Sequence, residues 1–258
     1  MSKLPSVSTF RLLGGQPQID AQVNPTQAAT IWLRRDIIRG VFAPGARLKV
    51  AHLCDFYHIG ASPIREAILL VSTSGLIVHE HQRGYRAAPV SHADYKDVAT
   101  IYRKLYRLAL DMAVENGGDQ WEERVVLALH RTAKVRKVLP SGDPEAREAW
   151  QWAYWSFHHE LLSGCNSPTL MRVFRDVGDR LERYVNIYAD LTEDVNRNHH
   201  AEHRAIVDAL IARDAETLFR LVDTYHGGAA EVLRSIAEAL KKLEATKGTG
   251  RAQSVAAE

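Results

Sequence analysis

Residues 60–68 combine a serine, a proline and an arginine in an order that suits contacts with nucleic acid. Pro63 fits the first turn of a helix, where its missing N–H group is not needed, and Ser62 is expected to cap that turn. Arg65 then leaves the helix near its N-terminus. In a helix-turn-helix module the second helix enters the major groove end-on, so its early residues meet bases and phosphates. The segment therefore predicts a recognition helix in a chain that binds DNA.

The stretches around this segment have the order of a winged helix-turn-helix module. Apolar residues at helical spacing predict a first helix from Pro25 to about Gly40 and a short second helix before the recognition helix. After it, residues 76–78 and 85–88 have extended character and predict a wing. The apolar positions are Ala29, Leu33 and Ile37 in the first helix and Val50, Leu53 and Phe56 in the second, and the wing tip is Gln82, Arg83 and Gly84.

The composition fits a DNA-binding protein of two domains. The chain has 258 residues, 46% of them hydrophobic, which is enough for two packed cores. A net charge of +2 is small, so a basic surface for DNA must be local. Cys54 and Cys165 fall one in each predicted domain and indicate no disulfide framework. With no membrane-length apolar run and no signal peptide, a cytoplasmic location without a membrane partner is expected.

The helical periodicity that follows Val90 predicts a second, all-helical domain. The fold class is therefore mostly α, with a winged helix-turn-helix module and its small β wing at residues 25–90 and a helical bundle at 91–243. Residues 1–24 are predicted to be a flexible arm and 244–258 a flexible tail. The helices expected in the bundle are 92–116, 120–138, 144–163, 168–191, 193–213 and 215–243.

Both predicted domains contain characteristic residues in a fixed order. They are Gly40, Pro44-Gly45, Leu48, Leu53, residues 62–68, Gly75-Leu76, Gly84-Tyr85, Phe157-His158, residues 202–206, Arg213-Asp214 and Tyr225-His226. This order resembles the GntR family of bacterial transcription regulators, in the FadR-like branch whose helical sensor is called the FCD domain, in its six-helix VanR-like version. The resemblance implies a homodimer that binds a roughly palindromic double-stranded operator, most often as a repressor, and senses a small metabolite in the helical domain.

The DNA-binding residues depart from the family pattern. Much of the family has an arginine where this chain has Ala51 and another where it has Ala61. Base readout is therefore expected to be redistributed, with more reliance on DNA shape, and Gly84 would let the wing backbone approach the minor groove. The candidate DNA-binding residues are Lys49, Ser62, Pro63, Arg65, His81, Arg83 and Gly84.

The expected effector pocket departs from the family pattern too. Many relatives have an arginine and a glutamate one turn apart in the first sensor helix, where this chain has Tyr102 and Tyr106. Tyrosine lacks the bidentate fork of a guanidinium, so we expect an effector that is not a simple carboxylate. Tyr154 is the third predicted pocket residue. A register one residue different would place Arg103 in the pocket instead.

A metal site is the third feature that the resemblance implies. Many FCD domains hold a divalent ion with one aspartate and three histidines, and His158, His203 and His226 are the counterparts of the histidines here. Tyr154 stands where the aspartate is expected. Three imidazoles suit zinc or nickel, and His199, one turn before His203, is a possible fourth ligand.

Two other functions compete with a metabolite-responsive regulator. The first is a metalloenzyme in which a three-histidine zinc activates water, with Glu160 and Glu202 as candidate general bases. His158, His159 and Glu160 themselves do not form one site, since adjacent helix residues point in different directions. The second is a regulator whose sensor has lost its effector, which the tyrosine substitutions also allow.

Overall fold

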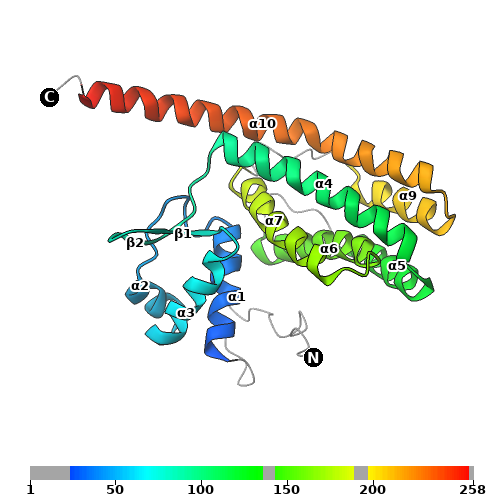
Figure 1. The fold of residues 1–258 in the computed structure, drawn as a ribbon, viewed down its shortest axis with the longest axis horizontal. Coiled ribbons are helices and arrows are strands. Elements are labelled where there is room, and N and C mark those ends of the chain that lie inside the picture. The colour runs from blue at the N-terminus through cyan, green and yellow to red at the C-terminus, as the bar shows by residue number, and fades with distance from the viewer. Residues whose placement is uncertain (1–23, 136–142, 189–196, 256–258) are drawn as a thin grey trace. The chain divides into compact units, whose positions relative to one another are not determined.

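The structure, a computed structural model, describes residues 24–135, 143–188 and 197–255, and the predicted arm lies almost wholly outside them (Figure 1). The chain divides into two compact units, Met1–Val90 and Ser91–Glu258. The break falls where the sequence changes from mixed to purely helical periodicity.

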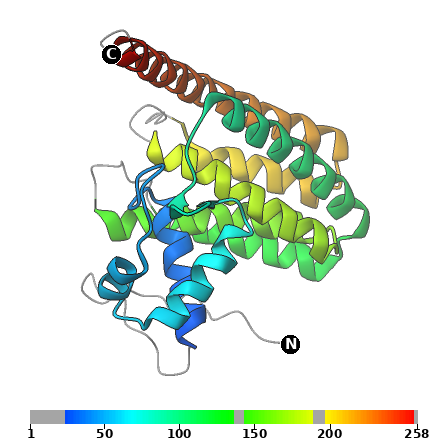
Figure 2. The same ribbon diagram turned by 60° about the vertical axis from the view of Figure 1, so that its left-hand side comes forward.

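The N-terminal unit is a winged helix-turn-helix, as predicted (Figure 1, Figure 2). Strands β1 and β2 pair antiparallel, with Ile77 opposite Ala87 and Glu80 opposite Gly84, and form the wing. At its tip Gln82 and Gly84 have positive φ angles of 60° and 81°, which the tight turn requires. The elements are α1 (Pro25–Ile38), α2 (Val50–Tyr57), α3 (Ala61–Ser72), β1 (Ile77–Glu80) and β2 (Gly84–Ala87).

A single apolar core holds this unit together. Leu33 of α1, Leu53 of α2 and Ile64 of α3 are fully buried in it. One charged group is buried beside them: the Asp36 carboxylate accepts hydrogen bonds from the Tyr57 hydroxyl at 2.8 Å and the Arg35 Nε at 2.9 Å. Because a buried carboxylate is tolerated only when it is hydrogen-bonded, this network fixes α1 against the end of α2.

The structure of α3 shows that the predicted N-cap, Ser62, is wrong. The helix begins at Ala61, Gly60 holds the N-cap position, and no side chain caps the turn. Ser62 lies inside the first turn, where its hydroxyl donates to Glu66 at 3.5 Å. Pro63 remains in the first turn, where no intrahelical N–H bond is lost. The helix therefore starts two residues earlier than the sequence suggests, because a glycine is an acceptable N-cap.

The second unit is entirely helical over its described residues. Helix α4 packs against α6, α7 and α10, while α5 packs against α6 and α9 (Figure 1). In the part of the chain that the structure covers, no helix is long and apolar enough to cross a membrane. The helices are α4 (His92–Asn116), α5 (Asp119–Ala133), α6 (Pro144–Ser163), α7 (Pro168–Ile187), α9 (His199–Ile211) and α10 (Ala215–Val255).

Each predicted helix of this unit is present, with differences at the ends. Helices α5 and α7 stop four to five residues before their predicted ends at 138 and 191, and α9 starts at His199 rather than at 193. The predicted ends at 138 and 191 and the predicted start at 193 fall outside the described residues. Helix α10 continues to Val255, through most of the segment predicted as a tail. Six of the residues 244–255 are good helix formers, and they extend a helix that is already nucleated, so the helix continues despite two glycines.

Candidate functional site

The exposed face of α3 presents the predicted recognition residues. Ile64, Ile68 and Val71 are buried against the core, while Ser62 and Arg65 are exposed on the first turns. Within the described residues Arg65 has no carboxylate at ion-pair distance. An unpaired guanidinium at the start of such a helix is available to bases and phosphates.

The other predicted DNA-binding residues precede or follow this helix start in the sequence. Lys49 is exposed at the N-cap position of α2, and His81 and Arg83 are exposed at the wing tip. Pro63 and Gly84 are half-buried. Arg86, which no sequence motif marks, supports the wing: its guanidinium donates to Glu80 at 2.8 Å and to the Gly45 carbonyl at 2.9 Å.

The predicted sensor residues meet inside the helical domain. Tyr106 of α4 shares a hydrogen bond of 2.9 Å with Nδ1 of His158 on α6, whose Nε2 lies 3.0 Å from the Tyr225 hydroxyl on α10. The same hydroxyl is 3.4 Å from Nε2 of His203 on α9 and is hydrogen-bonded to the Tyr154 hydroxyl. Four helices therefore contribute to one buried network of hydroxyls and imidazoles, centred on Tyr225.

Tyr102 belongs to the same interior through its ring. It contacts Phe174 with centroids 4.9 Å apart and Tyr106 with centroids 6.1 Å apart. Arg103, which a register one residue different would place in the pocket, is exposed. The tyrosines, and not the arginine, face the centre of the domain.

Burial keeps the histidines of this cluster neutral. Loss of solvent is the largest cause of each shift: the pKa of His203 falls to about 3, that of His226 to about 4, and that of His158 lies well below its ordinary value. Burial likewise raises the pKa of Tyr106, Tyr154 and Tyr225. At neutral pH the cluster offers uncharged donors and acceptors and no cationic imidazole.

The predicted metal ligands are only partly gathered. His158 and His203 direct Nε2 toward one point, but the Tyr225 hydroxyl occupies it. His226 instead packs edge-on against Tyr106, with centroids 4.4 Å apart. In residues 24–135, 143–188 and 197–255 no group of three or more His, Cys, Asp or Glu side chains is arranged to hold a metal ion. This arrangement does not fit a three-histidine site, and the metal ion stays a prediction.

The candidate general bases are engaged elsewhere. Glu160 accepts from Nε of Arg124 at 2.6 Å and from the Ser163 hydroxyl at 3.0 Å. Glu202 accepts from Nε of Arg197 at 2.9 Å and lies 3.8 Å from Nδ1 of His199, the possible fourth ligand. Within the described residues, no hydrogen bond joins either carboxylate to His158 or His203, so neither is positioned as a general base beside these imidazoles.

Two family models match the chain in the order of its two units. The model of the bacterial regulatory proteins of the gntR family matches residues 26–86, and that of the FCD domain matches residues 97–226. The chain belongs to the GntR family. It is a transcription regulator with an FCD effector-binding domain, and neither the family nor its relatives are enzymes.

Relatives of this GntR-family regulator share both units. The HTH-type transcriptional regulator BphR of Paraburkholderia xenovorans LB400 is 32% identical over 78% of this chain and 82% of its own. The HTH-type transcriptional repressor GlaR of Escherichia coli K12 is 28% identical over 71% of this chain and 84% of its own. The structure of a GntR regulator from Rhodococcus sp. RHA1 superposes with a TM-score of 0.60 at 25% identity, covering 81% of this chain and 97% of that one. Escherichia coli McbR/YncC shares the fold, with a TM-score of 0.65 at 18% identity over 86% and 100% of the two chains.

Proposed function

We propose that this GntR-family regulator is a cytoplasmic, metabolite-responsive repressor that binds a roughly palindromic operator as a homodimer. The observation that carries the proposal is the exposed, unpaired Arg65 at the start of α3, with Arg83 exposed on the wing that follows. In this arrangement α3 occupies the major groove and the wing tip approaches the minor groove. Two similar proteins of Escherichia coli K12 support the sign of regulation: GlaR and RspR, the latter 31% identical over 47% of this chain and 56% of its own, are both HTH-type transcriptional repressors.

The effector is proposed to bind among Tyr102, Tyr106 and Tyr154. A ligand there must exchange hydrogen bonds with the network centred on Tyr225, and the neutral histidines offer it no positive charge. The absence of charge on these histidines supports an effector whose buried end, next to Tyr225, is uncharged. To move the operator-bound fraction from 99% to 1%, the effector must favour the other state by about 5.5 kcal/mol.

Selection of bound sequences from a random double-stranded DNA library tests the DNA-binding part of this proposal. We expect the full-length protein to enrich a two-fold symmetric sequence whose half-sites are separated by about one helical turn. Metabolites are then screened for a rise in melting temperature and for release of the selected DNA, since a ligand that binds the native state stabilises it. Enrichment of an asymmetric sequence, or of none, would contradict a dimeric repressor.

The metal prediction has its own test. Elemental analysis of untagged protein, after zinc or nickel is added and excess removed, is compared between wild type and His203→Ala. About one ion per chain, lost in the variant, would mean that Tyr225 moves aside and that His203 is a ligand. No ion in the wild-type protein would contradict the site that the family resemblance implies and would leave the Tyr225 hydroxyl as the partner of both imidazoles.

A further inference from the structure

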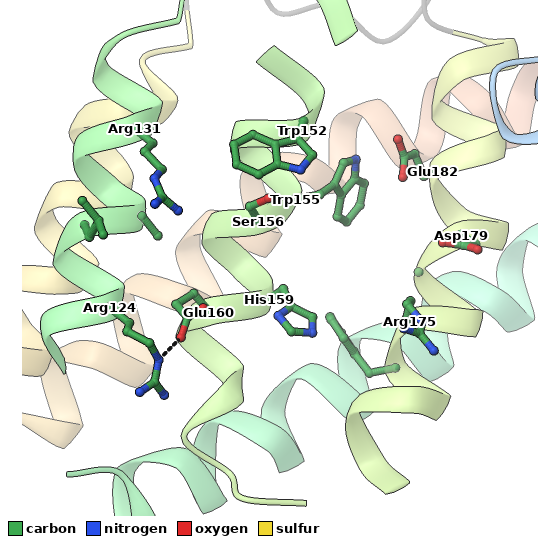
Figure 3. A pocket seen from close by; sticks show the side chains of 14 residues that line it. Arg124, Arg131, Trp152, Trp155, Ser156, His159, Glu160, Arg175, Asp179 and Glu182 are labelled. Carbon is green, nitrogen blue, oxygen red and sulfur yellow. Dashed lines mark hydrogen bonds and ion pairs between the residues drawn. The ribbon is translucent and has the colours of Figure 1, made fainter. Parts of the chain in front are cut away.

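A groove outside the Tyr225 network lies between helices α5, α6 and α7 (Figure 3). Its volume is about 500 Å³, which is in the range of small-molecule sites. Helix α5 contributes Arg124 and Arg131 on one side, and α7 contributes Arg175, Asp179 and Glu182 on the other (Figure 3). Helix α6 lies between them.

Two tryptophans give this groove a flat, apolar wall. The Trp155 ring is held edge-on by Tyr154 and Tyr102, with centroids 5.3 Å and 6.3 Å apart, so its orientation is set from inside the bundle. Trp152 is 38% exposed, which is high for so large an apolar side chain. Phe174 and Gly178 complete the wall from α7. A planar apolar ligand would cover this surface and remove it from water.

Two of the three arginines that line the groove have no carboxylate partner. Arg124 is paired with Glu160 at 2.6 Å, whereas within the described residues Arg131 and Arg175 have no ion pair. These two arginines come from opposite walls, Arg131 from α5 and Arg175 from α7, and Asp179 and Glu182 line the α7 side as well. The Arg175 guanidinium is therefore available to the carboxylate of a ligand.

Arg175 has a second polar group beside it. His159 projects from α6 toward α7 and lines the groove with Arg175 (Figure 3). An imidazole has at least one N–H donor in either protonation state, and this donor complements a guanidinium fork around a carboxylate. The cationic end and the tryptophan wall thus lie within one groove.

We propose that this groove is a second ligand site, which binds a small organic carboxylate with a flat apolar ring. The carboxylate lies on Arg175 and His159, and the ring lies against Trp152 and Trp155. The site is separate from the one proposed among Tyr102, Tyr106 and Tyr154. Trp155, Phe174 and Gly178 line the groove and also contact Tyr102. A ligand in the groove would therefore contact residues that pack against the proposed effector pocket.

The test uses the full-length protein without DNA and 2-naphthoate as the probe, with 2-naphthamide as its uncharged analogue. We expect isothermal titration calorimetry to show saturable binding of the acid and at least tenfold weaker binding of the amide. Arg175→Gln should weaken naphthoate binding at least tenfold, and Trp152→Ala at least fivefold. Arg172→Gln removes the same charge from an exposed position of α7 that does not line the groove, and it should stay within twofold of wild type.

The results distinguish this site from others on the protein. Equal affinity of Arg175→Gln and Arg172→Gln for naphthoate would place the ligand elsewhere and overturn the proposal, as would equal binding of acid and amide. Absence of naphthoate binding at millimolar concentration would overturn it as well. None of these outcomes depends on operator binding, so they leave the proposed repressor function to its own test.

Discussion

Replacing Arg65 with alanine is expected to weaken operator binding at least tenfold without unfolding the protein. Arg65 is exposed on the first turns of α3 and has no ion pair within the described residues, so its loss breaks no ion pair of the folded unit. A bidentate arginine contact to a base is worth about 1–3 kcal/mol, and about 1.4 kcal/mol corresponds to a factor of ten. With alanine at positions 51 and 61, fewer arginines are available to replace it.

Fluorescence anisotropy with the selected operator, at fixed salt, measures this effect. Lys96→Ala removes one exposed positive charge from α4 in the other unit and should change the affinity less than twofold. Arg65→Lys separates two roles of the arginine: it keeps the charge for phosphates but loses the fork for a base, so discrimination between operator and random DNA should fall. Unchanged operator affinity in Arg65→Ala would show that α3 is not the recognition helix.

The elements of this protein were predictable because their signals are local. Pro25 and Pro168 each mark the first position of a helix, and the turn residues Gln82 and Gly84 mark the wing. The end of α10 was not predictable in this way, because the glycines at 248 and 250 indicate a helix break when only the sequence is considered. The cap of α3 was misassigned for a similar reason: both Gly60 and Ser62 are compatible with the N-cap, and only the three-dimensional turn distinguishes them.

The interior of the sensor domain was predictable only in part. The family resemblance places Tyr102 and Tyr106 one turn apart on the first sensor helix, and both are buried on α4. The role of Tyr225 was missed, although it precedes a histidine of the family pattern, because its hydroxyl meets His158 and His203 only once α6, α9 and α10 are packed. The groove between α5, α6 and α7 leaves no sequence signal, since its lining residues come from separate helices and share no spacing.

A serine at Gly117 is expected to destabilise the helical domain by at least about 2 kcal/mol, in the upper part of the range for overpacked cores. A Cβ at this position would lie 2.0 Å from Cε3 of Trp121 and 2.6 Å from the Ala113 carbonyl oxygen. Trp121 cannot easily move away: its indole N–H donates to the Glu160 carbonyl at 3.0 Å, and a Cβ at Gly164 would lie only 2.5 Å from its Cε2. The backbone of Gly117, with φ −73° and ψ 138°, suits any residue, so the effect is steric.

The adjacent glycine provides the matched control for this prediction. A Cβ at Gly118 meets nothing within 4 Å, and this residue holds the N-cap position of α5, where serine is preferred over glycine. Gly118→Ser should therefore leave the free energy of unfolding unchanged or raise it by about 0.5 kcal/mol. Urea unfolding followed by tryptophan fluorescence reports mainly on this domain, because only Trp32 of the five tryptophans lies in the other unit. Equal urea midpoints for the two variants would mean that Trp121 moves without loss of stability. In that case, the packing of its ring between Gly117 and Gly164 would not fix how α4, α5 and α6 pack together.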